Sequence, residues 1–218
     1  MVIGLQEILR TARVLLAAIL IQLALAPASA GTLRIRVVDA AGHPVADAVV
    51  ALRPQGTPPS RPHPSIGSRI TQQGMQFHPF VTVVPVGSTV SFPNLDPFRH
   101  HVYSFSPTKR FELKLFARDE TRSITFDKGG IVAIGCNIHD NMSAFIYVTD
   151  TPWTVRTGSD GTAIFHDTPG GSYSLQAWHP FLRAPGETLS FIRQAGADRA
   201  ETITVKLRSP PMRGTGGY

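Results

Sequence analysis

The chain has 218 residues, of which 42% are hydrophobic, and its 21 Lys and Arg against 15 Asp and Glu give a formal net charge of +6. This balance is typical of a folded globular protein and excludes an intrinsically disordered one. Eighteen prolines and 19 glycines interrupt the chain often, which favours short strands and turns over long helices. The single cysteine excludes an intramolecular disulfide and any structural zinc site that needs two cysteines.

The beginning of the chain has the pattern of an export signal. Arg10 and Arg13 form a positive start, residues 14–26 form an apolar run, and residues 28–30 (ASA) match a small-x-small cleavage site. The run is shorter than the about 20 apolar residues that a membrane-spanning helix requires. We therefore predict a signal peptide over residues 1–30, export to the periplasm and no stable membrane insertion after cleavage. An uncleaved anchor is the alternative.

Beyond the leader, short apolar runs alternate with turn residues. The expected strands are residues 33–38, 48–52, 80–84, 89–92, 102–105, 123–126, 131–134, 144–148, 162–166, 172–178 and 202–207. Residues 55–64 hold four prolines and are expected to form a linker or long loop, and the Pro/Gly-rich residues 209–218 are expected to be a disordered tail. No sustained helical period follows the leader, so we predict an all-β protein built of sandwiches.

The strongest chemical signal lies in residues 135–142 (GCNIHDNM). A thiol at Cys136, an imidazole at His139 and a thioether at Met142 follow one another at intervals of three residues, where a strand is expected to end in a loop. Soft sulfur together with imidazole suits copper, and two histidines, one cysteine and a weak axial methionine form the blue-copper donor set. The pattern therefore indicates a copper site that needs one more histidine.

The second histidine is available in residues 92–102, where His100 and His101 come directly before an expected strand. Since neighbouring strand residues point to opposite faces, only one of the two can point at the site. Asn94, in the same segment, either hydrogen-bonds to the ligand loops or makes a turn.

Together these motifs resemble those of the cupredoxins. Residues 77–94 look like the opening strands of the family, in which the first histidine ligand follows the Asn by six positions. The resemblance assigns that role to His100, with His101 as the alternative, and the C-x₂-H-x₂-M spacing resembles the ligand loop of amicyanin. It implies a cupredoxin Greek-key sandwich over residues 72–148 that binds one copper ion, as Cu(I) or Cu(II), through His100, Cys136, His139 and Met142.

Two features depart from the family pattern. Asp140 and Asn141 stand where amicyanin-type proteins carry apolar residues, so the apolar docking patch around the exposed histidine is expected to be weaker or differently charged. His101 stands where the family commonly has Asn, which would alter the hydrogen bonds around the site.

A second resemblance covers both ends of the mature chain. Residues 157–165 and 169–175 are similar to carboxypeptidase-regulatory-like, transthyretin-like sandwiches, whose usual opening of a strand, a D-x-x-G-x-P turn and an A-V-V strand stands at residues 33–50. We predict a discontinuous domain of residues 31–54 and 151–208, with the cupredoxin domain inserted. The alternative is a cupredoxin with an extra N-terminal strand, followed by a small C-terminal sandwich. The whole arrangement resembles the cupredoxin-domain proteins labelled methylamine-utilisation proteins.

The resemblance implies a periplasmic one-electron carrier with type 1 copper rather than an enzyme. Its partner would be a redox protein such as a cytochrome c or a dehydrogenase. Nucleic acid is excluded as a partner because no Lys/Arg stripe is evident. One alternative is copper binding or delivery without electron transfer, and another is a sandwich that binds a partner or a glycan. A hydrolase that uses Cys136 and His139 is disfavoured because no orienting acid or oxyanion element is evident.

Six basic residues could form a docking face for an acidic partner, and scattered solvated charge is the alternative. They are Lys109, Arg110, Lys114, Arg118, Arg122 and Lys128.

Overall fold

The structure is a computed structural model that describes residues 30–56, 67–139 and 141–209, together with Gly4. These residues form 17 strands and one 3₁₀ turn, η1 (Pro185–Glu187), which confirms the predicted all-β class. Most of the predicted signal peptide, of the tail and of the Pro-rich linker lies outside the described residues. Within the described part of the chain, no helix is long and apolar enough to cross a membrane.

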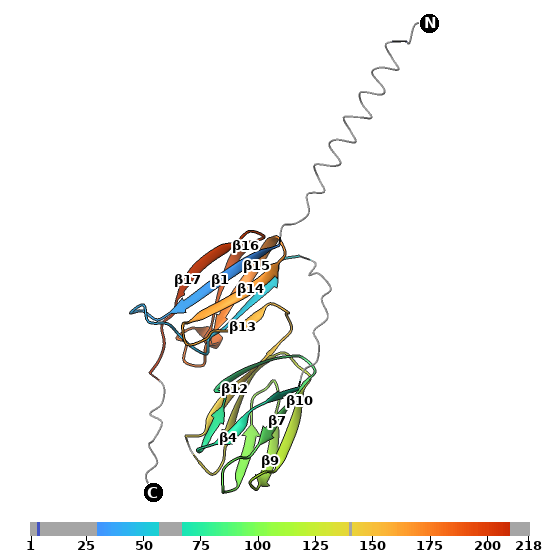
Figure 1. Cartoon of the computed structure of the whole chain (residues 1–218), viewed down its shortest axis with the longest axis vertical. Coiled ribbons are helices and arrows are strands. Elements are labelled where there is room, and N and C mark those ends of the chain that lie inside the picture. Colours follow the sequence, from blue (N-terminus) through green and yellow to red (C-terminus); the bar gives the residue numbers. More distant parts are fainter. Residues whose placement is uncertain (1–3, 5–29, 57–66, 140, 210–218) are drawn as a thin grey trace.

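Strands from both ends of the chain build one sandwich, which we call the split sandwich. Its members are β1 (Gly31–Val38), β2 (Val49–Pro54), β13 (Thr154–Arg156), β14 (Thr162–Thr168), β15 (Gly171–Trp178), β16 (Thr188–Ala195) and β17 (Arg199–Thr204). One sheet has the order β14-β1-β17 and the other β13-β2-β15-β16. In Figure 1, the blue strand β1 lies between β14 and β17 from the other end of the chain.

The amino-acid pattern explains this sandwich. Leu33, Ile35 and Val37 alternate with the exposed Arg34 and Arg36, so that one face of β1 is buried in the core and the other meets solvent. Across the core, apolar residues of β2 and β15 pack against this face.

The strands between β2 and β13 build a second unit, the central sandwich. Its members are β3 (Gly67–Arg69), β4 (Thr71–Gln73), β5 (Gln76–His78), β6 (Val81–Pro85), β7 (Ser88–Pro93), β8 (His100–Ser104), β9 (Phe111–Phe116), β10 (Thr121–Phe126), β11 (Gly130–Cys136) and β12 (Ser143–Thr149). A sheet of order β10-β7-β3 faces a sheet of order β6-β12-β11-β8-β9, and β4 and β5 form a separate hairpin. Phe92, Phe116, Phe126 and Ile146 are fully buried between the two sheets.

The strand pairing bears on the domain organisation. β1 pairs with β14 and β17, and β2 pairs with β13 and β15, across about a hundred residues of intervening chain. These pairings support the proposal that residues 31–54 and 151–208 form one discontinuous domain with residues 72–148 inserted.

The two sandwiches meet in a small apolar cluster. Trp178 of β15 packs against Phe145 and Tyr147 of β12, with both pairs of ring centroids 5.8 Å apart. Phe181 stacks on Phe80 at 6.0 Å. The central sandwich therefore packs directly against the split sandwich and is not joined to it by the chain alone.

Several strands differ from the sequence expectation. The predicted strand ranges do not include β3, β4, β5, β9, β13 and β16, and β17 begins at Arg199, three residues before the predicted start. β9 and β16 are edge strands that carry few buried residues, so their apolar signal is weak. The position of β17 follows from its parallel register with β1, in which Leu33 lies opposite Arg199.

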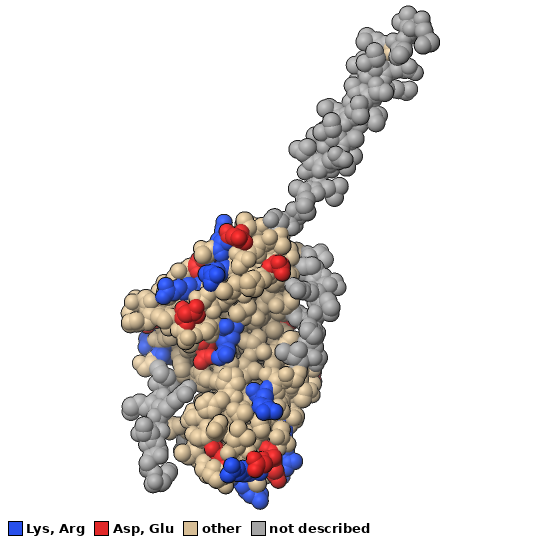
Figure 2. Space-filling model, viewed as in Figure 1, with Lys and Arg blue, Asp and Glu red and all other residues tan. Residues whose placement is uncertain are grey.

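Charged residues on the visible face do not gather by sign. Figure 2 shows basic and acidic side chains interspersed over both sandwiches. Of the six basic residues that could form a docking face, three form ion pairs with acidic neighbours: Lys109 with Asp127, Arg118 with Asp119, and Arg122 with Glu120.

Candidate metal centre

Two neighbouring strands of the five-stranded sheet bring the first two candidate ligands together. β8 begins at His100 and β11 ends at Cys136, and the antiparallel register places Cys136 opposite Val102. His100 lies two residues before Val102 and therefore points to the same, buried face of the sheet. Both side chains consequently enter the same end of the sandwich core.

The loop after β11 folds back and carries His139 over Cys136. The amide of Met142 donates to the carbonyl oxygen of His139 at 3.0 Å, and the amide of Cys136 donates to the carbonyl oxygen of Met142 at 3.1 Å. These two bonds bring the backbone of Met142 back beside Cys136 and His139.

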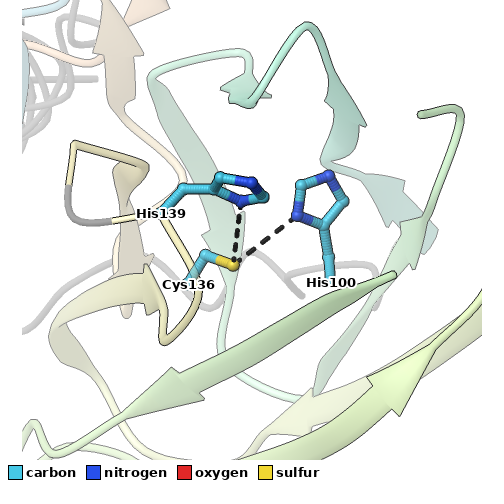
Figure 3. A group of neighbouring side chains, drawn as sticks. All are labelled: His100, Cys136 and His139. Carbon is cyan, nitrogen blue, oxygen red and sulfur yellow. Dashed lines mark hydrogen bonds between the residues drawn. The ribbon is translucent and has the colours of Figure 1, made fainter. Parts of the chain in front are cut away.

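Three donor atoms converge at this point, as Figure 3 shows. The Sγ atom of Cys136 lies 3.5 Å from Nδ1 of His100 and 3.8 Å from Nδ1 of His139, and the three donor atoms all lie within 4.8 Å of one another. In zinc sites the metal lies about 2.0 Å from a nitrogen ligand and about 2.3 Å from a sulfur ligand. At a trigonal angle between the two bonds, the nitrogen and the sulfur would lie roughly 3.7 Å apart. The observed distances therefore fit a metal ion held between the three residues.

Met142, the fourth candidate, is buried in the same core cluster as Cys136. Its backbone closes the loop described above. Its side chain is thus buried in the core that also holds Cys136, and its role as a ligand is part of the proposal below.

His101 points away from this group. Its Nε2 lies 3.0 Å from a carboxylate oxygen of Glu112 on β9, and its ring contacts Tyr103 on the outer side of the sheet. Of the two neighbouring histidines, His100 is the one that faces Cys136.

The loop before β8 is organised by Asn94. Its side-chain amide donates to the carbonyl oxygens of Phe98 at 2.8 Å and Phe116 at 3.2 Å, and its Oδ1 accepts the amide of Asp96 at 3.0 Å. Asn94 therefore makes the turn, and its hydrogen bonds also hold the segment that precedes His100.

Sequence reasoning missed Asp96, which touches a candidate ligand directly. A carboxylate oxygen of this buried residue lies 2.7 Å from Nε2 of His100. An acid four residues before a histidine in a Pro-flanked loop is a weak signal, since most such acids are exposed.

The electrostatics of the group favour a thiolate. Burial by itself raises the pKa of Cys136, but hydrogen bonds from His100, from backbone amides and from His139 outweigh it and lower the pKa from 9.0 to about 6. Burial likewise lowers the pKa of His100, but its contacts with Cys136 and Asp96 outweigh this, and the pKa lies above its ordinary value. A thiolate is the form of cysteine that binds metal.

Comparison with known proteins gives structural neighbours only. No protein-family model and no curated protein matches the chain. A copper-containing nitrite reductase from Thermus scotoductus is 26% identical with a TM-score of 0.38, over 45% of this chain and 26% of that one. An oxidised amicyanin mutant is 22% identical (TM-score 0.36; 38% of this chain, 82% of that one). A purple cupredoxin from Nitrosopumilus maritimus is 20% identical (TM-score 0.34; 38% of this chain, 99% of that one). The chain thus spans about a quarter of the nitrite reductase's length.

Proposed function

We propose that this protein is an exported one-electron carrier with a type 1 copper site. The observation that carries the proposal is the convergence of two imidazole Nδ1 atoms and one cysteine sulfur at the end of a β-sandwich. This donor set, with a methionine beside it, suits copper better than other first-row metals. The ligands would be His100, Cys136, His139 and Met142, which hold a single copper ion.

Copper held in this way would supply the redox chemistry, by alternating between Cu(I) and Cu(II). The protein's part is to keep the donors still. His100 and Cys136 sit on the ends of paired strands, and the loop that carries His139 and Met142 is closed by backbone hydrogen bonds. Because the donors are already assembled, little rearrangement is needed when the charge of the bound ion changes.

Electrons would enter and leave at His139. This side chain is half-buried, whereas His100, Cys136 and Met142 are buried. His139 is therefore the ligand nearest to a docked redox partner, such as a cytochrome c or a dehydrogenase. The signal-peptide pattern supports a location in the periplasm. In this role the protein would transfer electrons and would not transform a substrate.

Copper delivery without electron transfer is the second candidate. The observation that favours it is the same half-exposed His139, through which a receiving protein could take the ion. A carrier and a delivery protein differ in how fast the site exchanges its metal.

The first experiment is a Cu(II) titration of the purified protein followed by visible absorption. We expect an intense thiolate-to-Cu(II) band that disappears in Cys136→Ser and survives in His101→Gln, the control that changes the histidine facing away. A wild-type protein that stays colourless with Cu(II), although its thiol is reduced, would contradict the assignment of a type 1 copper site. Reversible one-electron voltammetry with slow loss of copper to a chelator supports the carrier, while rapid loss supports delivery.

A further inference from the structure

Asp96 is a buried acid that links a backbone turn to a candidate ligand. It lies between β7 and β8, and its side chain is 6% exposed. One carboxylate oxygen accepts the amide of Gly74 at 2.6 Å, and the other accepts the amide of Met75 at 3.0 Å and lies 2.7 Å from Nε2 of His100.

The hairpin turn that holds this carboxylate presents two consecutive backbone amides to it. Gly74 and Met75 join β4 to β5, whose residues Gln73 and Gln76 pair, and both turn residues have positive φ, 63° and 57°. Two consecutive left-handed residues form a tight hairpin turn, and successive amides in such turns can bind an anion. The carboxylate is therefore held in place by the hairpin as well as by His100.

This contact determines which nitrogen of His100 is free. A carboxylate accepts hydrogen bonds, so Nε2 carries the proton and donates it to Asp96. In the neutral ring, the form that binds a metal, Nδ1 then carries no proton, and Nδ1 is the atom that faces Cys136. A histidine held by a carboxylate in this way is also a stronger donor to a metal.

We propose that Asp96 is a positioning residue that fixes His100 with Nδ1 toward the copper and lowers the reduction potential of the site. The proposal rests on the function proposed above. The buried negative charge interacts more strongly with Cu(II) than with Cu(I), because the oxidised ion carries one more positive charge and the surroundings screen it poorly. It therefore stabilises the oxidised state.

The residue after His100 offers a matched control for the contact between Asp96 and His100. His101 pairs with Glu112 at 3.0 Å, in the same kind of histidine–carboxylate contact, but the Glu112 side chain is 59% exposed and His101 faces away from Cys136. Solvent and salt screen an exposed carboxylate, so its removal should affect the site little.

The test compares the midpoint potentials of copper-loaded wild type, Asp96→Asn and Glu112→Gln. We expect Asp96→Asn to raise the potential and Glu112→Gln to leave it near the wild-type value. Outer partners of metal-bound histidines typically change metal affinity by about 10- to 100-fold. A tenfold weakening of Cu(II) binding relative to Cu(I) corresponds to a rise of about 59 mV for a one-electron couple. Equal shifts in the two variants would overturn the proposal.

A measurement on the wild type tests the role of Asp96 independently, in case Asp96→Asn does not fold. In the diamagnetic Cu(I) form, nitrogen-edited NMR should show a proton on Nε2 of His100 that exchanges slowly with water. A proton that exchanges at once would overturn the role of Asp96.

Failure of the function and failure of this inference are distinguishable. If the wild type shows no Cys136-dependent band, both fall together. If the band is present but the potentials of the two variants move alike, only the role of Asp96 falls.

Discussion

The Sγ atom of Cys136 lies 3.5 Å from Nδ1 of His100, although 36 positions separate the two residues in the chain. The contact depends on the antiparallel pairing of β8 with β11, which aligns the start of one strand with the end of the other. Each residue has a second partner: the backbone amide of Cys136 donates to the carbonyl oxygen of Met142, and Nε2 of His100 lies against the Asp96 carboxylate.

Replacing His100 by Ala should abolish the copper band and also destabilise the metal-free protein. The substitution removes one of the three hydrogen bonds to the buried Asp96 carboxylate, which typically costs about 1–3 kcal/mol. Urea unfolding of the metal-free protein would measure this loss. In His101→Ala the band should persist, and a copper spectrum that disappears in both variants would contradict the assignment of His100.

Replacing Met142 by Leu should preserve the copper–thiolate band and raise the reduction potential. Leu has a similar volume, so the buried position should lose less than about 1.5 kcal/mol of stability. If the thioether of Met142 binds the copper, it would act as a weak donor that tunes the potential, and its removal would take a ligand from the oxidised ion. Voltammetry that gives an unchanged potential would show that Met142 serves only as part of the core.

Replacing Trp178 by Ala should destabilise the protein by about 3–5 kcal/mol, the usual cost of removing a large buried aromatic ring. Trp178 is 1% exposed and packs between the two sandwiches against Phe145 and Tyr147. Ile192→Ala is the comparison, because Ile192 is 60% exposed and its loss should cost less than about 0.5 kcal/mol. Thermal unfolding of both variants checks the difference, and similar melting temperatures would contradict the packing role.

Stability should decrease on acidification through His179. Burial lowers the pKa of this histidine below its ordinary value of 6.5, and its Nδ1 accepts the amide of Phe181 at 3.2 Å, which requires the neutral ring. The contribution of His179 is therefore complete above about pH 6.5, where the unfolded chain is also neutral, and is lost as the pH falls toward the lower folded-state pKa.

His179→Gln should flatten this part of the pH profile, measured as the free energy of unfolding in urea. His166→Gln, at an exposed position, should leave the slope as it is in the wild type. An unchanged slope in His179→Gln would show that acid destabilisation arises elsewhere.

Local pattern was sufficient for the core strands but not for the edges. Strands such as β1, β7 and β12 carry several buried apolar residues, so alternation alone predicts them. β9 is exposed along most of its length and depends on pairing with β8 for its conformation, a contact that no short window of sequence contains. The same is true of β16, which pairs with β15 at the edge of its sheet.

The alternation of short apolar runs with turn residues is enough to predict the all-β class. The donor types of the candidate site are also predictable, because Cys136, His139 and Met142 lie in one loop where chain spacing controls their separation. Tertiary structure decided which of two adjacent histidines faces the cysteine, since strand register sets that choice. It also decided the role of Asp96. The amides that hold its carboxylate come from a hairpin turn more than twenty residues earlier, so only the packing of the hairpin against the loop makes this acid a buried partner of His100.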